Sequence, residues 1–226
     1  MSNFASSNPV ILKGLRAAWL DIFKPGEGMN GGAPKFKFTG LMAPDSEAAT
    51  VAKAAMLEAA KGLWNENAVN VIKSMAANSK ALRNGNDKLN DDGTIRDEYK
   101  DMLFISASNK ATQRPQVVGP KKHNGKFPTI TEDGRAMIDG IDVTNELGYE
   151  VKAPYRGCFV NAKVTFVAGK SFKGSDGQII PNQVFARIIA IQFVRDGEAF
   201  GSGPTSAEGF DEEEVETAGE GASDLF

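Results

Sequence analysis

Two residue types on which many enzymes depend are almost missing from this chain of 226 residues. It has one cysteine, Cys158, and one histidine, His123. A single cysteine excludes an internal disulfide framework, and one cysteine with one histidine cannot form a thiolate zinc site. Cys158 lies in an apolar run, so we expect a small buried side chain there. His123 lies in a loop rich in lysine and glycine, which is more typical of a phosphate-facing segment than of a catalytic pocket.

Long apolar runs are also missing. No window approaches the roughly 18 consecutive apolar residues of a membrane-spanning helix, and the first residues do not show the charged and apolar regions of a signal peptide. The chain is 41% apolar and 24% charged, which is typical of a globular protein with one domain. We therefore expect a cytoplasmic protein without a membrane partner.

Basic residues are absent from the last part of the sequence. The chain has 26 basic and 29 acidic side chains, and ten of the acidic ones follow Arg195, where no basic residue remains. Residues 1–195 therefore carry a net charge of about +7, and residues 196–226 carry about −10. A basic body joined to an acidic segment is typical of proteins that handle nucleic acid.

The acidic segment has an unusual end. Four carboxylates follow one another from Asp211 to Glu214, and the last three residues are Asp224, Leu225 and Phe226. Glycine, serine and glutamate dominate residues 204–226, so we predict a disordered tail that follows a domain of residues 1–203. A tail that only adds solubility has no use for a bulky apolar tip, so we expect Asp224, Leu225 and Phe226 to bind a partner.

Alternation of apolar and polar residues indicates a mainly β protein of the α+β class. Lys35, Lys37 and Thr39 share one face of a short strand, and Phe36 and Phe38 share the other face, which we expect in the core. The pattern predicts strands over 9–23, 35–39, 99–108, 116–118, 158–166 and 183–194. Alanine-rich helical spacing predicts an insertion at about 45–78 with helices over 46–61 and 66–77, followed by a polar loop over 84–97. These elements fit an OB-fold-like five-stranded β-barrel with inserted helices.

Several short motifs lack the context that their chemistry needs. The G-x-G-x-x-G spacing at 26–31 is followed by a strand instead of the helix that would hold a pyrophosphate. Residues 169–171 end like a P-loop, but no helix follows them. The acidic turn at 90–93 would place Lys88 and Tyr99 at ligand positions of a calcium loop, and neither can ligate properly. We therefore predict no cofactor and no enzymatic activity. Asp139, Asp142 and Glu146 leave a carboxylate-only metal nuclease as a weaker alternative.

Aromatic residues interleaved with cations give the positive signal. A cationic groove with aromatic faces is the usual means of holding single-stranded nucleic acid, because phosphates pair with the cations and bases stack on the rings. Phe159 and Lys163 share the polar face of their predicted strand, which favours a binding surface. The predicted DNA-binding residues are Arg16, Trp19, Lys35, Lys37, Tyr155, Arg156, Phe159 and Lys163.

The sequence resembles a family of phage single-stranded DNA-binding proteins with an oligonucleotide-binding fold. The resemblance covers most of residues 9–203. It rests on residues 16–19 with Phe23 and Pro25, on 106–108 ahead of Arg114 and Pro115, on 155–161 and on 192–201. The tail is similar to the acidic, phenylalanine-terminated tails of replicative single-stranded DNA-binding proteins. It lacks the proline of the bacterial versions and so resembles the phage type more closely.

The resemblance implies sequence-tolerant binding of single-stranded DNA in phage replication, recombination or repair, in the cytoplasm of the infected host cell. It is compatible with a homodimer. The acidic tail would compete with DNA for the basic groove and, once displaced, would recruit a replication protein such as a polymerase or helicase. Two alternatives remain besides the nuclease: a strand-annealing protein, and a non-enzymatic interaction or virion accessory module whose tail only solubilises.

Overall fold

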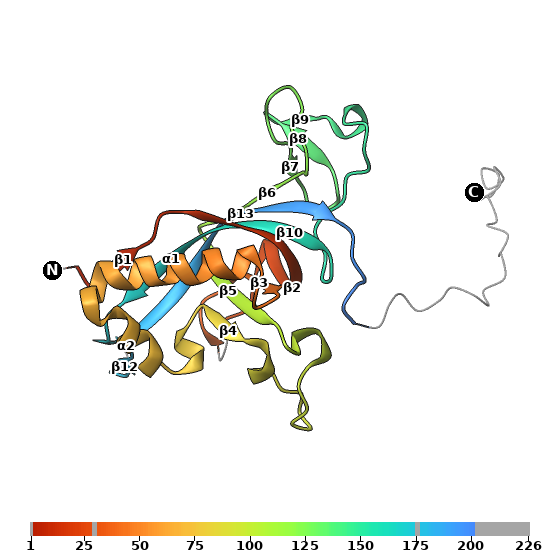
Figure 1. Cartoon of the computed structure of the whole chain (residues 1–226). Helices are drawn as coiled ribbons and strands as arrows, with labels where there is room; N and C mark the ends of the chain where they lie inside the picture. Colours follow the sequence, from red (N-terminus) through yellow and green to blue (C-terminus); the bar gives the residue numbers. More distant parts are fainter. Residues whose placement is uncertain (1, 29–30, 175–176, 202–226) are drawn as a thin grey trace, which may run out of the picture.

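A computed structural model (Figure 1) describes residues 2–28, 31–174 and 177–201. The predicted tail, including Asp224, Leu225 and Phe226, lies outside the described residues. The strands are β1 (Phe4–Ser6), β2 (Val10–Gly26), β3 (Lys35–Met42), β4 (Leu82–Asn84), β5 (Leu103–Lys110), β6 (Gln116–Val118), β7 (Thr129–Ile130), β8 (Ala136–Ile138), β9 (Ile141–Asp142), β10 (Phe159–Gly169), β11 (Phe172–Lys173), β12 (Ile179–Ile180) and β13 (Gln183–Arg195). The helices are α1 (Glu47–Trp64) and α2 (Ala68–Ser74), together with several short 3₁₀ turns.

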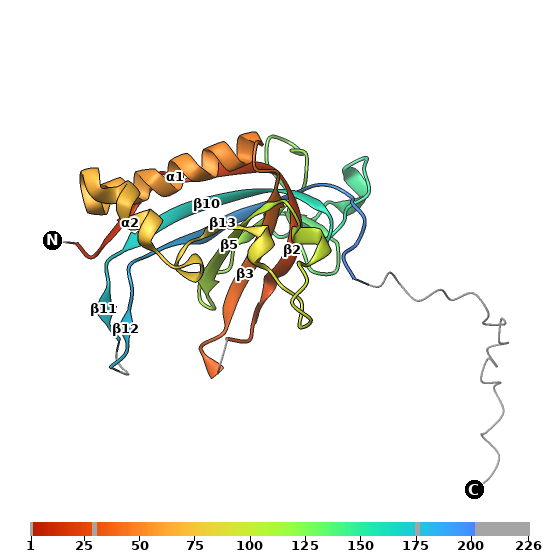
Figure 2. The same cartoon turned by 60° about the horizontal axis from the view of Figure 1, so that its bottom comes forward.

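Five strands close into a barrel in the order β10, β2, β3, β5, β13 and back to β10. All of these pairs are antiparallel except β5 with β13, which meet in parallel at Ala107 and Ala186. This architecture confirms the predicted OB-fold-like barrel. Figure 2 shows that the β2–β3 and β11–β12 hairpins project from the same side of the barrel.

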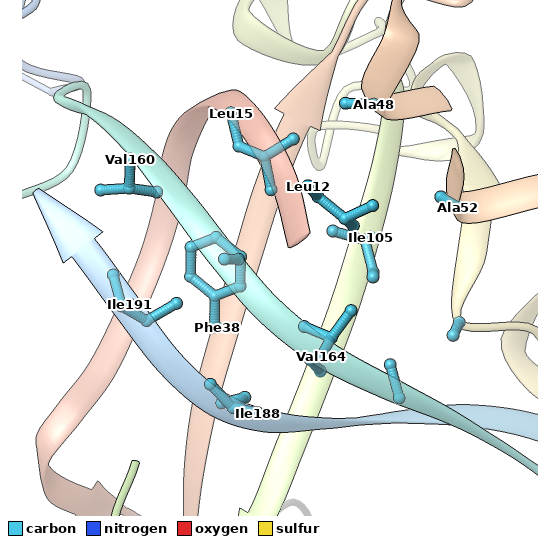
Figure 3. Packing of buried hydrophobic residues seen from close by; sticks show 14 of the residues in the cluster. Leu12, Leu15, Phe38, Ala48, Ala52, Ile105, Val160, Val164, Ile188 and Ile191 are labelled. Atoms are coloured by element: carbon cyan, nitrogen blue, oxygen red, sulfur yellow. The ribbon is translucent and has the colours of Figure 1, made fainter. Parts of the chain in front are cut away.

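The barrel interior is filled by the inward residues of the alternating strands. Figure 3 shows this packing for members of one cluster, with Leu12 and Leu15 of β2, Phe38 of β3, Ile105 of β5, Val160 and Val164 of β10, and Ile188 and Ile191 of β13. Phe36 and Phe38 are both buried, as predicted. Cys158 is fully buried as well, and burial raises the pKa of its thiol to about 11, so the thiol stays neutral at physiological pH.

Helix α1 covers one side of the barrel, over β2 and β10. Ser46 is its N-cap, because its Oγ accepts a hydrogen bond from the Ala49 backbone amide at 3.2 Å. The helix turns a row of buried alanines towards the strands: Ala48, Ala49, Ala52, Ala55, Ala59 and Ala60. These small side chains allow the helix axis to lie close to the sheet.

The structure differs from the sequence-based expectation in several elements. The strand expected over 99–108 begins only at Leu103, because Asp97–Tyr99 forms a 3₁₀ turn. The second helix was expected over 66–77 but α2 covers only Ala68–Ser74, because Asn65 has a positive φ of 49° and Met75 is extended. The expected polar loop at 84–97 contains one 3₁₀ turn, Gly85–Asp87, and an isolated bridge between Leu89 and Ile95. The meander β7–β9 was not expected, because its strands of two or three residues are too short to show alternation. No helix among the described residues has the length and apolar character needed to cross a bilayer.

Two neighbouring residues of β2 test which face builds the core. Leu12 is fully buried, whereas Ile11 is 53% exposed. We expect Leu12→Ala to lower the free energy of unfolding by about 2–5 kcal/mol, because it removes buried methyl groups and leaves a cavity. Ile11→Ala is the matched control and should change it by about 0.5 kcal/mol or less. Urea denaturation measures the free energy of unfolding of both variants. Equal losses would contradict the assignment of Leu12 to the buried face and Ile11 to the exposed face of β2.

Candidate nucleic-acid interface

A groove of about 620 Å³ lies over the outward face of β3 and β5. We call it the cationic groove, because the described residues of its lining include five cations and no carboxylate. The cations are Lys35, Lys37, Arg83, Lys88 and Arg96. Trp19 of β2 lies at one side, and Gly28, Gly32 and Ala33 of the β2–β3 connection line another part.

Strand alternation explains why the floor of the groove is polar. In β3, Phe36 and Phe38 point inwards, so Lys35, Lys37 and Thr39 point outwards. The register of β3 with β5 places Ser108 opposite Lys37 and Ser106 opposite Thr39. Small hydroxyl side chains therefore line the floor between the cations, and they leave room for a ligand.

Arg83 is the most constrained cation of the groove. Strand β4 pairs with β5 so that Arg83 lies opposite Phe104, and its guanidinium carbon lies 4.6 Å from the centre of that ring. Arg83 Nη2 donates a hydrogen bond to Ser106 Oγ at 2.7 Å. Its Nε is buried and has no hydrogen-bond partner among the described residues. A buried donor without an acceptor is costly, so Arg83 is held in the groove at a cost in stability.

The positive charges of the groove repel one another. The Lys88 ammonium lies 5.6 Å from the centre of the Phe104 ring, over which the Arg83 guanidinium also lies. Burial lowers the pKa of Lys88, and the charges of Arg83 and Arg96 lower it further. Burial also lowers the pKa of Arg83, and Tyr99 and Asp87 offset that effect only in part. Among the ion pairs of the described residues, none involves a cation of the groove.

Trp19 and Arg156 meet at the edge of the groove. The Arg156 guanidinium carbon lies 5.3 Å from the centre of the Trp19 ring, and its Nε donates a hydrogen bond to the Ala18 carbonyl at 3.0 Å. Trp19 is 46% exposed. An exposed indole beside a fixed cation can accept a stacked base while the cation contacts the adjacent phosphate.

The segment that follows β13 is fixed at this same edge. Phe200 lies under the Arg16 guanidinium, 4.1 Å from its carbon, and packs against a small cluster of Ala18, Leu41, Tyr99 and Phe104. Arg16 Nη2 donates a hydrogen bond to the Glu198 carbonyl at 2.9 Å. Arg16 therefore holds the segment in place beside the groove.

Two further predicted residues also have structural partners. The Tyr155 hydroxyl accepts a hydrogen bond from the Gly197 amide at 3.1 Å and lies 3.0 Å from the Asp196 carboxylate. The Phe159 ring is covered by the Arg195 guanidinium, whose carbon lies 3.5 Å from the ring centre. These contacts use Tyr155 and one face of Phe159 to anchor the end of β13.

The predicted DNA-binding residues are thus divided between several places. Trp19, Lys35 and Lys37 line the cationic groove, and Arg156 lies over Trp19 at its edge. Lys163 lies in a different hollow on the outward face of β10. The sequence analysis missed Arg83, Lys88 and Arg96. The available signal was the repeated occurrence of cations between 80 and 96, but no periodicity linked them to the strand that carries Phe104.

The carboxylates considered for a metal nuclease have separate partners. Asp139 pairs with Lys126 at 2.5 Å, Asp142 accepts a hydrogen bond from the Thr144 hydroxyl at 2.6 Å, and Glu146 lies 3.4 Å from His123. The part of the chain that the structure describes contains no group of three acidic, histidine or cysteine side chains placed to hold a metal ion.

The mutual repulsion in the groove predicts stabilisation by a polyanion. Tripolyphosphate should raise the melting temperature of the protein above its value in sodium chloride of equal ionic strength, because an anion bound to the folded state stabilises it. Arg83→Met should reduce this gain strongly. Lys61→Met removes an exposed cation from the last turn of α1 and should leave the gain unchanged. An equal gain in the Arg83 variant would contradict the proposed anion site.

Comparisons with known proteins concern the fold and the family of the chain. A family model described as "Enterobacter phage Enc34, ssDNA-binding protein" matches residues 8–219. A putative protein, p50, of Acyrthosiphon pisum secondary endosymbiont phage 1 is 30% identical over 207 residues, which cover 89% of this chain and 91% of p50. The single-stranded DNA-binding protein of bacteriophage Enc34, solved in complex with ssDNA, has a similar fold, with a TM-score of 0.55, 19% identity, and coverage of 85% of this chain and 89% of that chain.

A second solved structure of the same Enc34 protein gives a TM-score of 0.51 with 18% identity, over 88% of this chain and 87% of that one. At these identities the structural likeness shows the fold, and the family match carries the assignment. The match covers almost the whole chain and confirms the resemblance found in the sequence. The chain belongs to the Enc34 phage single-stranded DNA-binding protein family.

Proposed function

We propose that the protein binds single-stranded DNA without sequence preference and without catalysis, and that it protects and organises that DNA in phage replication, recombination or repair. The observation that carries the proposal is the cationic groove, which brings five cations together without a carboxylate in its lining. The family assignment and the ssDNA-bound structure of the Enc34 protein support it. The site of action would be the cytoplasm of the infected host cell.

Each part of the groove has a counterpart in a single strand. Lys37, Arg83 and Lys88 can neutralise successive phosphates, and counterion release then drives binding. Trp19 offers an aromatic face, and stacking of a base on such a face contributes about 1–3 kcal/mol. The bases of a duplex are already paired and stacked on one another, so this contribution favours single strands. Since every base has a stacking face, the contact does not depend on sequence.

The acidic tail would regulate this binding by competing for the same cations. The last described residues lie at the Trp19 edge of the groove, where the Phe200 amide donates a hydrogen bond to the Arg156 carbonyl at 3.1 Å. Eight carboxylates follow in residues 202–226. Because the tail is covalently joined to the domain, we expect its effective local concentration to be roughly in the mM range. We take residues 204–226 as the regulatory tail and residues 1–203 as the DNA-binding domain.

DNA that enters the groove would then release the tail. Asp224, Leu225 and Phe226 combine a carboxylate with two apolar side chains, and they suit an apolar pocket with a basic rim on a replication protein such as a polymerase or helicase. In this proposal the occupied protein recruits its partner more readily than the free protein does.

Binding is tested with a fluorescent oligo-dT of about 30 nucleotides and a duplex of the same length, at several salt concentrations. We expect strong preference for the single strand, with a log–log salt slope of about −0.7 per neutralised phosphate. Trp19→Ala should weaken binding by about 5- to 150-fold, which corresponds to the loss of about 1–3 kcal/mol of stacking. Trp64→Phe, in α1 away from the groove, is the control. Equal affinity for duplex, or an unchanged Trp19 variant, would contradict the proposal and favour the interaction-module alternative.

Deletion of residues 208–226 tests the tail. The shortened protein should bind oligo-dT more tightly at low salt and should no longer retain a polymerase or helicase partner in pull-down assays, because the competing carboxylates and the apolar tip are gone. A second variant keeps the full length of the tail but replaces its carboxylates with amides. It separates the effect of the tail's charge on DNA binding from the effect of its volume. Unchanged affinity of the deletion variant at low salt would exclude the competition, while leaving the groove as the DNA site.

A further inference from the structure

Two lysines face each other at one end of the cationic groove. Lys35 of β3 and Lys110 of β5 are direct partners across the strands, and both are exposed. Like charges in this position destabilise a sheet. Neither lysine takes part in the ion pairs formed by the described residues. An anion that passes between them would remove the repulsion, so the groove has a positively charged exit at this end.

Beyond Lys110 the chain leads directly to a second hollow of about 330 Å³. Its lining includes Arg114 from the turn after β5 and Arg187 from β13, and no carboxylate of residues 2–28, 31–174 or 177–201 belongs to it. Asn109 holds the two elements together, because its side chain donates to the Ile188 carbonyl at 2.6 Å and accepts from the Ile188 amide at 3.1 Å. Both arginines are exposed.

A third hollow, of about 620 Å³, lies further along β10 and β13, which also line the second hollow. Thr165 of the second hollow and Lys163 of the third are alternate residues of β10, so they lie on one face about 7 Å apart. Phe127 forms part of the wall and is 41% exposed, with the Lys122 ammonium 5.4 Å from its ring centre. The carboxylate in this lining is Asp139, which is neutralised by Lys126 at 2.5 Å.

We propose that a single strand longer than the cationic groove leaves it between Lys35 and Lys110 and continues over this outer strip, which we define as Arg114, Arg187, Lys163 and Phe127. The inference rests on the proposed function. It would explain why Lys163 lies outside the groove and yet has no ion-pair partner among the described residues. Along the strip the cations would contact phosphates, and Phe127 would stack a base.

The arrangement favours nucleic acid over a second copy of the chain. An isologous contact would bury the cation-rich patches of two copies against each other, which is unfavourable. A strand of DNA instead carries one charge of the opposite sign at every nucleotide, so it can match a row of cations that begins at the exit of the groove.

The length of the bound strand separates this strip from the groove. We would compare oligo-dT of about 8 nucleotides, within the range that a single OB fold covers, with oligo-dT of about 30 nucleotides. The double variant Lys163→Ala with Arg187→Ala should bind the short strand like the wild type. For the long strand its salt slope should fall by about 1.4, which corresponds to about 25-fold weaker binding near 0.1 M salt. The matched control is Lys61→Ala with Lys73→Ala, on the two helices.

Lys37→Ala, in the groove, should weaken the binding of both lengths. If Lys37→Ala does so and the Lys163–Arg187 variant binds the long strand normally, the outer strip is excluded and the proposed function stands. If no variant and no wild-type protein binds, the proposed function itself fails. Equal losses of the double variant on both lengths would contradict a continuation beyond the groove. A loss that disappears when residues 208–226 are removed would assign the strip to the acidic tail and overturn the inference.

Discussion

Closure of the barrel by the β5–β13 and β13–β10 pairs is the constraint on which the other features depend. A closed barrel of five strands has an interior that only apolar side chains fill, so every strand residue with a charge must lie outside. The register of β3 with β5 then decides which polar residues face each other, and it places Lys37 opposite Ser108 and Thr39 opposite Ser106. The same alternation on β10 and β13 arranges Lys163 and Arg187 on the outward face.

The cationic groove places like charges close together, which lowers the stability of the protein without its ligand. Arg83 and Lys88 both lie over the Phe104 ring, and burial lowers the pKa of both. The folded protein accepts this repulsion because β4, the 3₁₀ turns and the Phe104–Tyr99 pair hold the side chains in place, with the two ring centres 5.3 Å apart. Phosphates would provide the missing negative charge, so the groove is organised before its ligand arrives.

The long strands and their two faces could be predicted from the sequence, because the alternation of β3 and β10 is regular over many residues. Which residues lie opposite one another on neighbouring strands could not be predicted in this way. Arg83 reaches the groove through pairing of β4 with β5, a contact between residues about 20 positions apart that leaves no local pattern. Lys88 and Arg96 lie on irregular turns for which neither helical nor strand spacing exists. For the same reason the Arg195 guanidinium over Phe159 was not expected, and the free face of this ring was overestimated.

Hydrogen–deuterium exchange with and without oligo-dT is the most direct test of the central claim that the cationic groove holds a single strand. The account predicts slower exchange in β3 and β5 and in the turns between β4 and β5, which carry Lys88 and Arg96, with no change along the body of α1. DNA-dependent protection confined to other parts of the barrel, with the groove unchanged, would contradict it.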